Sequence, residues 1–89
     1  MTFEYEIFYH PDVPKKDLPR ISPDIQRRIR QSIELKLGTS PQLFSAPLRR
    51  SLHGYWKLRI GDYRVIYKMD AKNKQLTILR IGHRREVYD

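Results

Sequence analysis

Hydrophobic positions recur with a period of two in some parts of the chain and with a helical period in another, and this contrast predicts the order of its elements. From Phe3 to Tyr9 every second residue is aromatic or aliphatic, which is typical of a strand with one buried face. We expect a short helix over residues 12–18, because Pro14 and Pro19 limit its length.

A longer helix is predicted over residues 23–37. Its apolar residues lie four positions apart on one stripe, at Ile25, Ile29, Ile33 and Leu37. Ser22 suits the N-cap, Pro23 suits the first helical position, and Gly38 suits the end of the helix. We expect a loop over residues 38–54, which contain two proline residues and a second glycine.

Strand patterns return from residue 55 onward. Residues 55–60 and 63–69 flank a Gly-Asp connection, which predicts a tight hairpin and therefore fixes the register of the two strands. This register places Arg59 opposite Arg64 and divides the side chains between two faces. The predicted core face carries Trp56, Leu58, Ile60, Tyr63, Val65 and Tyr67. The other face carries Tyr55, Lys57, Arg59, Arg64, Ile66 and Lys68.

A further strand is predicted over residues 76–81, and residues 83–89 form a tail after Gly82. The predicted order is therefore β-α-α-β-β-β. We interpret the chain as an α+β fold in which two N-terminal helices pack on one antiparallel sheet. A length of 89 residues favours a single domain over residues 1–89.

The positive charge of the chain is concentrated in its C-terminal half. The chain has 18 Lys and Arg residues against 10 Asp and Glu residues, a net charge of +8. Residues 1–48 contribute seven basic and six acidic residues, or +1, whereas residues 49–89 contribute eleven and four, or +7. No apolar run approaches the roughly 20 residues that span a membrane. With no cysteine and no signal-peptide pattern, we expect a cytoplasmic protein without membrane contact.

The predicted basic face groups Lys57, Arg59, Arg64 and Lys68, and its two strands carry no acidic residue. One interpretation is an ordinary solvated face, on which the long side chains spread into water. Directly opposed like charges are nevertheless destabilising on a sheet. As a group, these residues favour an external anion, most simply a phosphate, which arginine binds through two parallel hydrogen bonds.

The sequence offers few other catalytic groups. We find no placed carboxylate pair, no glycine-rich phosphate loop and no metal-ligand spacing among His10, His53 and His83. Catalysis on nucleic acid at this face would therefore use no metal and no cofactor. RNA can supply its own nucleophile, because its 2′-hydroxyl can attack the adjacent phosphate and leave a 2′,3′-cyclic phosphate. The protein would then align the groups and neutralise charge.

Two motifs carry a family resemblance. Lys-Leu-Arg-Ile-Gly-Asp-Tyr-Arg-Val-Ile-Tyr at residues 57–67 and Gly-His-Arg-Arg-Glu-Val-Tyr at residues 82–88 resemble the RelE/ParE toxin superfamily of type II toxin–antitoxin modules. Members of the RelE branch are ribosome-dependent endoribonucleases that cut messenger RNA in the A site. The resemblance implies this activity here, with the ribosome, messenger RNA and a cognate antitoxin as partners.

The resemblance also implies roles for individual residues. It marks a catalytic set of Lys57, Arg64, Arg84 and Tyr88. In this set Lys57 is a base or charge stabiliser and Arg64 is the phosphate clamp. Arg84 assists the leaving group, and Tyr88 stacks or orients. We expect RNA contacts from Arg59, Lys68, His83 and Arg85.

Several assignments stay open at this point. His83 is an alternative proton donor, since histidine titrates near neutral pH, or an ordinary strand-end residue. Arg85 can take the place of Arg84. Tyr55 stands where a well-known relative has a second lysine.

Two other functions remain possible for the same fold. One is a ParE-like inhibitor of DNA gyrase without ribonuclease activity. The other is a degenerate toxin that only binds its antitoxin or RNA. The catalytic set is often missing from ParE-like relatives, so its presence here favours the ribonuclease.

Overall fold

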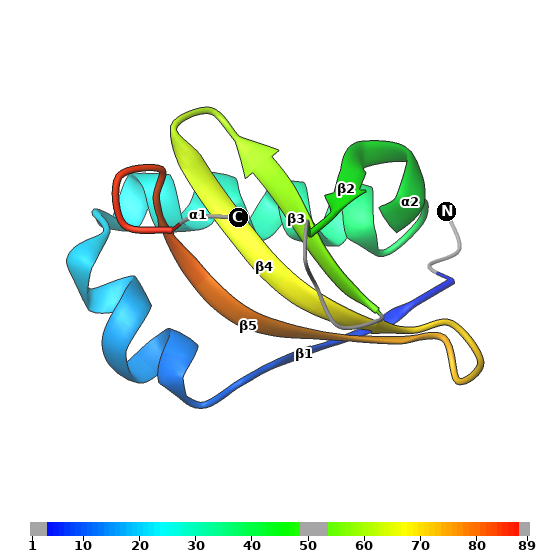
Figure 1. The fold of residues 1–89 in the computed structure, drawn as a ribbon. Coiled ribbons are helices and arrows are strands. Elements are labelled where there is room, and N and C mark those ends of the chain that lie inside the picture. The colour runs from blue at the N-terminus through cyan, green and yellow to red at the C-terminus, as the bar shows by residue number, and fades with distance from the viewer. Residues whose placement is uncertain (1–3, 49–53, 88–89) are drawn as a thin grey trace.

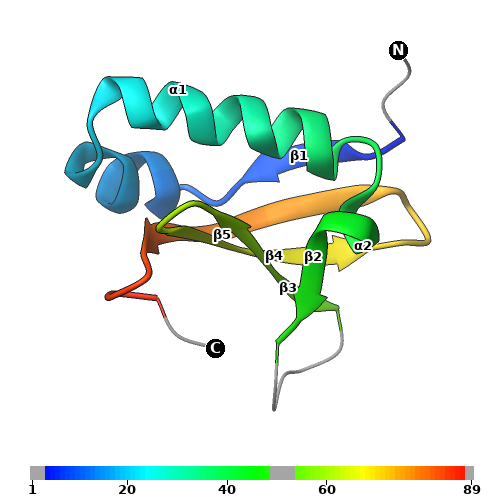
Figure 2. The same ribbon diagram turned by 90° about the horizontal axis from the view of Figure 1, so that it is seen from above.

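The computed structural model describes residues 4–48 and 54–87. These residues form one five-stranded sheet in the order β1-β5-β4-β3-β2. Its strands are β1 (Glu6–Tyr9), β2 (Ser45–Pro47), β3 (Tyr55–Ile60), β4 (Tyr63–Asp70) and β5 (Gln75–His83). Figure 1 views the sheet from the face opposite α1, and Figure 2 shows α1 on the other side of the strands.

The helical layer begins with two short helices, Val13–Asp17 and Leu18–Arg20. The main helix, α1 (Pro23–Ser32), continues into a π-type turn over Ile33–Leu37, which confirms the helix predicted over residues 23–37. Its stripe is buried where it faces the sheet, since Ile29, Ile33 and Leu37 are at most 1% exposed. In the described part of the chain, no helix has the length and apolar composition needed to cross a membrane.

The predicted loop over residues 38–54 was wrong in its first half. A one-turn helix, α2 (Pro41–Phe44), is followed directly by β2, which pairs with β3 at the edge of the sheet. Both elements are too short for a periodic pattern, and β2 tolerates a proline because it is an edge strand. Residues 49–53 lie outside the described residues.

The expected α+β fold is confirmed, with one correction to strand direction. The pairs β2–β3, β3–β4 and β4–β5 are antiparallel, as expected, but β1 runs parallel to β5. The local pattern of β1 shows that it is a strand. It contains no information about its partner, because that partner lies more than sixty residues further along the chain.

The predicted hairpin register is confirmed in every pair, including Arg59 opposite Arg64. The core face is also confirmed. Leu58, Val65 and Tyr67 are at most 1% exposed, and Trp56, Ile60 and Tyr63 pack against this core. Burial raises the pKa of Tyr67 to about 12.

A β-bulge interrupts β5. Tyr67 pairs with Ile78, whereas the neighbouring Ile66 pairs with Arg80, so that Leu79 is an extra residue on β5. Before the bulge, Ile78 points into the core. Without it, the period of two would carry Arg80 to the core side as well. The bulge instead brings Arg80 to the opposite face, where it is exposed.

Candidate functional site: the open face of the sheet

The sheet face opposite α1, here called the open face, is organised in rows of cross-strand neighbours. The first row is Arg59, Arg64 and Gly82. The second row is Ala46, Lys57, Ile66 and Arg80. The third row is Tyr55, Lys68, Thr77 and Phe8, and the fourth is Asp70, Gln75 and Glu6. The first two rows therefore bring together four cationic side chains from three strands.

Arg64 is fixed at the hairpin end of the open face. Its Nη1 donates hydrogen bonds to the carbonyl oxygens of Gly61, at 2.9 Å, and of Tyr63, at 3.0 Å. Gly61 has a φ of +57°, which the tight turn requires and which a glycine adopts without strain. The turn thus orients the guanidinium group of Arg64.

Arg84 lies against the same turn. Its backbone N–H donates to the carbonyl oxygen of Asp62 at 2.7 Å, and its Nε lies 3.9 Å from Asp62 Oδ1. Both side chains of this ion pair are more than half exposed, so we expect the pair to contribute little stability. Arg64 and Arg84, which the sequence predicts as site residues, therefore both contact the turn at Gly61 and Asp62.

Lys57 occupies a different environment from its charged neighbours. It is 8% exposed, whereas Arg59 on the same strand is exposed. Its cross-strand neighbours are the apolar residues Ala46 and Ile66, which flank its hydrocarbon stem. A charge removed from bulk water interacts more strongly with a bound anion than an exposed charge does. Lys57 is therefore sheltered from solvent, whereas Arg59 is exposed to it.

The tail after β5 folds back onto the open face, as Figure 2 shows. The backbone N–H groups of Glu86 and Val87 both donate to the His83 carbonyl, and Arg80 Nη2 donates to the Glu86 carbonyl at 2.9 Å. Val87 is 5% exposed because it packs over Gly82. A Cβ atom on Gly82 would lie only 2.7 Å from Val87 Cγ2. Tyr88, the fourth member of the predicted catalytic set, lies outside the described residues.

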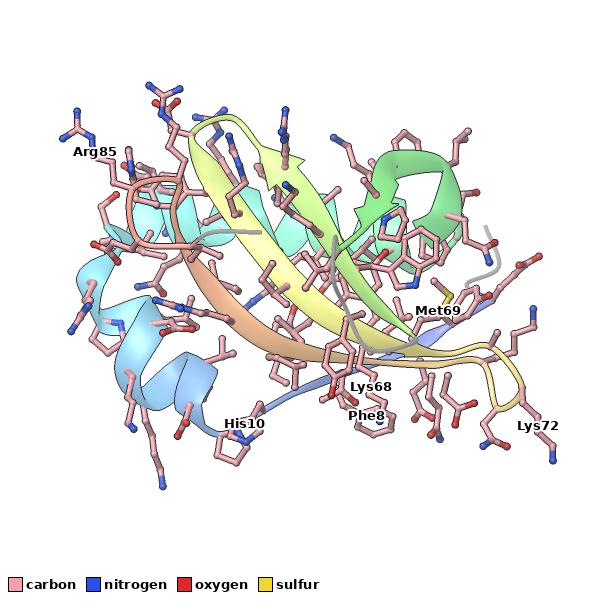
Figure 3. All side chains as sticks on the ribbon, viewed as in Figure 1. Phe8, His10, Lys68, Met69, Lys72 and Arg85 are labelled. Atoms are coloured by element: carbon pink, nitrogen blue, oxygen red, sulfur yellow. The ribbon has the colours of Figure 1, made fainter. Side chains whose placement is uncertain are left out.

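The structure separates His83 from the rest of the predicted site. His83 pairs with Tyr63 beyond the bulge, on the helix side of the sheet, and their rings make an edge contact at 5.6 Å. Its Nδ1 accepts the backbone N–H of Arg85. Arg85 itself is exposed, and Figure 3 shows its side chain pointing away from the sheet. Lys68 lies on the open face, one row beyond Lys57.

Arg80 is the site residue that sequence reasoning missed. It joins the row of Lys57 and Ile66, and it also holds the tail through the Glu86 carbonyl. The period of two places it in the core, and only the bulge at Leu79 corrects this. The sequence nevertheless indicates the bulge, because an arginine at an expected core position is rarely buried and therefore favours a departure from regular alternation.

The described residues contain no group of three or more histidine, cysteine, aspartate or glutamate side chains that would hold a metal ion. The groups that the open face does offer are guanidinium and ammonium groups on a rigid sheet. Such groups bind phosphate oxygens and stabilise negative charge that develops during a reaction. Fold and site together define a small α+β protein with a cationic sheet face.

Comparisons with known proteins agree with this class. Residues 5–88 match the family model described as the ParE toxin of the type II toxin–antitoxin system parDE. The chain is 32% identical over 74 residues to toxin RelG of Mycobacterium tuberculosis, which covers 83% of this chain and 85% of that protein. It is also 32% identical over 73 residues to toxin RelE of the same organism, covering 82% and 75%.

Solved structures show the same relationship. The toxin–antitoxin complex RelBE2 from Mycobacterium tuberculosis matches with a TM-score of 0.82 and 29% identity, covering 90% of this chain and 98% of that one. The archaeal RelE–RelB complex from Pyrococcus horikoshii matches with a TM-score of 0.71 and 25% identity, covering 94% and 99%. The chain belongs to the RelE/ParE superfamily, and it is a toxin of a type II toxin–antitoxin system.

Proposed function

We propose that the protein is a ribosome-dependent endoribonuclease that cleaves messenger RNA without a metal ion. The observation that carries this proposal is the arrangement at the hairpin end of the open face. Arg64 and Arg84 both contact the turn at residues 61–63, and Lys57 and Arg59 lie on the adjoining strand. The requirement for the ribosome comes from the family resemblance to the RelE branch.

The chemistry is an attack of the RNA 2′-hydroxyl on the adjacent phosphorus. The new bond joins the 2′-oxygen to phosphorus, and the bond from phosphorus to the 5′-oxygen breaks. The 2′-hydroxyl proton passes to a base, and the departing 5′-oxygen gains a proton. The products are a 2′,3′-cyclic phosphate and a 5′-hydroxyl end.

The three described members of the predicted catalytic set, Lys57, Arg64 and Arg84, have separate roles in this proposal. Arg64 binds the scissile phosphate and stabilises the extra charge of the pentacoordinate transition state. Lys57 acts as the base or as a second charge stabiliser. Arg84 stabilises the negative charge on the departing 5′-oxygen. The removal of one positioned donor of this kind typically costs about 10²–10³ in rate.

We also infer a cognate antitoxin that binds and inhibits this protein. The structural relatives RelBE2 and archaeal RelE–RelB are complexes of a toxin with an antitoxin. The charge of this chain, +8, favours a partner with acidic segments.

The proposal is tested on messenger RNA bound in the ribosomal A site. We expect cleavage that persists in the presence of a chelator and leaves a 2′,3′-cyclic phosphate. A 2′-deoxy substitution immediately before the scissile bond should abolish cleavage, because it removes the nucleophile. Continued cleavage of that substrate would exclude the mechanism.

A second candidate is inhibition of DNA gyrase, which is favoured by the match to a family model described as a ParE toxin. Induced expression separates the two functions. Rapid arrest of translation supports the ribonuclease, whereas DNA damage and filamentation with intact translation support the gyrase inhibitor. If Arg64→Gln and Arg84→Gln proteins fold and remain fully toxic, the ribonuclease proposal is wrong and a binding function replaces it.

A further inference from the structure

The open face continues beyond the cationic rows into a row that the proposed chemistry does not use. The register joins Tyr55 to Lys68, Lys68 to Thr77, and Thr77 to Phe8. We call these four residues the aromatic row. It places two aromatic rings and one ammonium group side by side on the face opposite α1, and Figure 3 shows Phe8 and Lys68 in the same part of the sheet.

Phe8 is unusual because its ring faces water on a sheet that has a well-packed core on the other side. It is 43% exposed, whereas its neighbour Ile7 packs against the core cluster. The alternation of β1 directs Phe8 away from the core, so the core does not explain a large apolar ring at this position. One exposed ring is common on protein surfaces, but Phe8 shares a cross-strand row with a second aromatic residue, Tyr55, and the pair makes this part of the open face a candidate contact surface.

Tyr55 and Lys68 form the other end of the aromatic row. Lys68 Nζ lies 5.7 Å from the centre of the Tyr55 ring, within the range of a cation–π contact. The lysine is exposed and the tyrosine is half-buried. The pair therefore combines a flat ring with a positive charge, which are the two features that proteins use to hold single-stranded nucleic acid.

The charge of the neighbouring rows sets the limits of this surface. On one side lie Lys57 and Arg80 in the second row. On the other side lie Asp70 and Glu6 in the fourth row. Hydrogen bonds from Asn73 to the Asp70 carboxylate lower its pKa, so the group is ionised at neutral pH. On the open face the aromatic row therefore lies between a cationic row and an acidic row.

We propose that the aromatic row binds the nucleotides next to the scissile phosphate, with Phe8 and Tyr55 stacking on unpaired bases and Lys68 contacting the intervening backbone. This inference rests on the proposed function, because it assigns further nucleotides to the same RNA. Tyr55 lies two residues from Lys57 along β3, about 7 Å away. Phe8 lies three strand spacings from Tyr55, roughly 14 Å away. The row therefore begins beside the reacting groups and extends across the sheet.

The test uses a short single-stranded RNA that carries the fluorescent base 2-aminopurine and 2′-O-methyl groups throughout, so that it cannot be cleaved. Phe8→Leu removes the ring but keeps an aliphatic side chain. Loss of a base–aromatic contact is worth about 1–3 kcal/mol, which corresponds to roughly 5- to 150-fold weaker binding. Phe8→Tyr keeps the ring and should bind as the parent does. Leu43→Ala is the matched control, because Leu43 is 76% exposed on α2.

Salt dependence distinguishes stacking from charge. The slope of log K against log salt should be unchanged in Phe8→Leu, whereas it should fall by about 0.7 in Lys68→Gln, the value for one phosphate contact on a single strand. Thermal unfolding confirms that each variant is folded. A folded Phe8→Leu protein with parental affinity would overturn the aromatic row as an RNA site.

The outcome is separable from that of the proposed function. Ring-dependent binding without cleavage of ribosome-bound RNA would overturn the ribonuclease and retain the aromatic row. Cleavage by a protein whose RNA binding does not depend on Phe8 would retain the ribonuclease and overturn the aromatic row.

Discussion

The two faces of the sheet are built from alternate residues of the same strands, yet they serve opposite purposes. Leu58 and Val65 point toward α1 and are at most 1% exposed, while Arg59 and Arg64 lie one residue away on the open face and oppose each other. Burial of a large aliphatic side chain stabilises the fold by about 1.5–3 kcal/mol. The opposition of two like charges costs up to about 1 kcal/mol.

This difference separates stability from function at the level of single residues. The covered face supplies the free energy that holds the twisted sheet together. The open face uses part of that free energy to keep cationic groups close together before any anion binds. We therefore expect substitutions on the two faces to affect different measurements, and the following predictions test how complete that separation is.

The largest effect is expected on the covered face. Leu58→Ala should lower the free energy of unfolding by about 2–5 kcal/mol, because it leaves a cavity at the centre of the core. Urea unfolding followed by circular dichroism measures this change. A loss below 1 kcal/mol would show that Leu58 is not part of a tightly packed core.

On the open face, Arg64→Gln should leave stability nearly unchanged but reduce the rate of RNA cleavage by about 10²–10³. Its hydrogen bonds to the turn are replaced by water, and the opposition to Arg59 is relieved. Lys72→Gln is the control, since it removes an equal charge from the β4–β5 turn, at the far end of the molecule in Figure 3. Equal rates for the two variants would contradict a specific role for Arg64.

Gly82→Ala tests whether packing also matters on the open face. The new methyl group would collide with Val87 Cγ2 and displace the tail that carries Arg84. Misplacement of a reacting group by about 1 Å can cost up to about 10²-fold in rate. We expect a loss of roughly tenfold or more in cleavage, and recovery in the double variant Gly82→Ala/Val87→Ala. A double variant as slow as the single one would exclude the steric explanation.

The smallest effect is expected at Arg59. Arg59→Gln should raise the free energy of unfolding by a few tenths of a kcal/mol, because it removes the like charge opposite Arg64. RNA binding should weaken about equally for all sequences, as is typical of a phosphate contact. A decrease in stability would show that the two arginine residues do not repel each other in the folded protein.

Local patterns predicted those parts of the fold that depend on neighbouring residues. The two-residue turn after Ile60 fixed the hairpin register, and the stripe of Ile29, Ile33 and Leu37 identified the main helix. The parallel pairing of β1 and the addition of β2 depend on contacts between distant segments. No periodic pattern in either strand specifies such contacts.

The same distinction applies to the site. Lys57, Arg59 and Arg64 lie on one hairpin, so its register was sufficient to group them. The sheet face on which Arg80 and His83 lie depends on the bulge at Leu79. Regular alternation along β5 does not predict this bulge. The roles of Lys57, Arg64 and Arg84 in catalysis stay predictions, as does that of Tyr88.

The bulge has a consequence for the design of variants and for the alignment of relatives. Side chains along a strand alternate between the two faces of the sheet. One extra residue exchanges the faces taken by odd- and even-numbered residues in the rest of the strand. Deletion of Leu79 would remove the bulge and leave regular alternation, with Ile78 and Ile81 on the core side and Arg80 between them on the open face. A graft of this tail onto a regular strand would therefore omit the extra residue. In an alignment, a relative without the bulge takes a gap at Leu79, and without that gap core and surface positions would be exchanged for the rest of the strand.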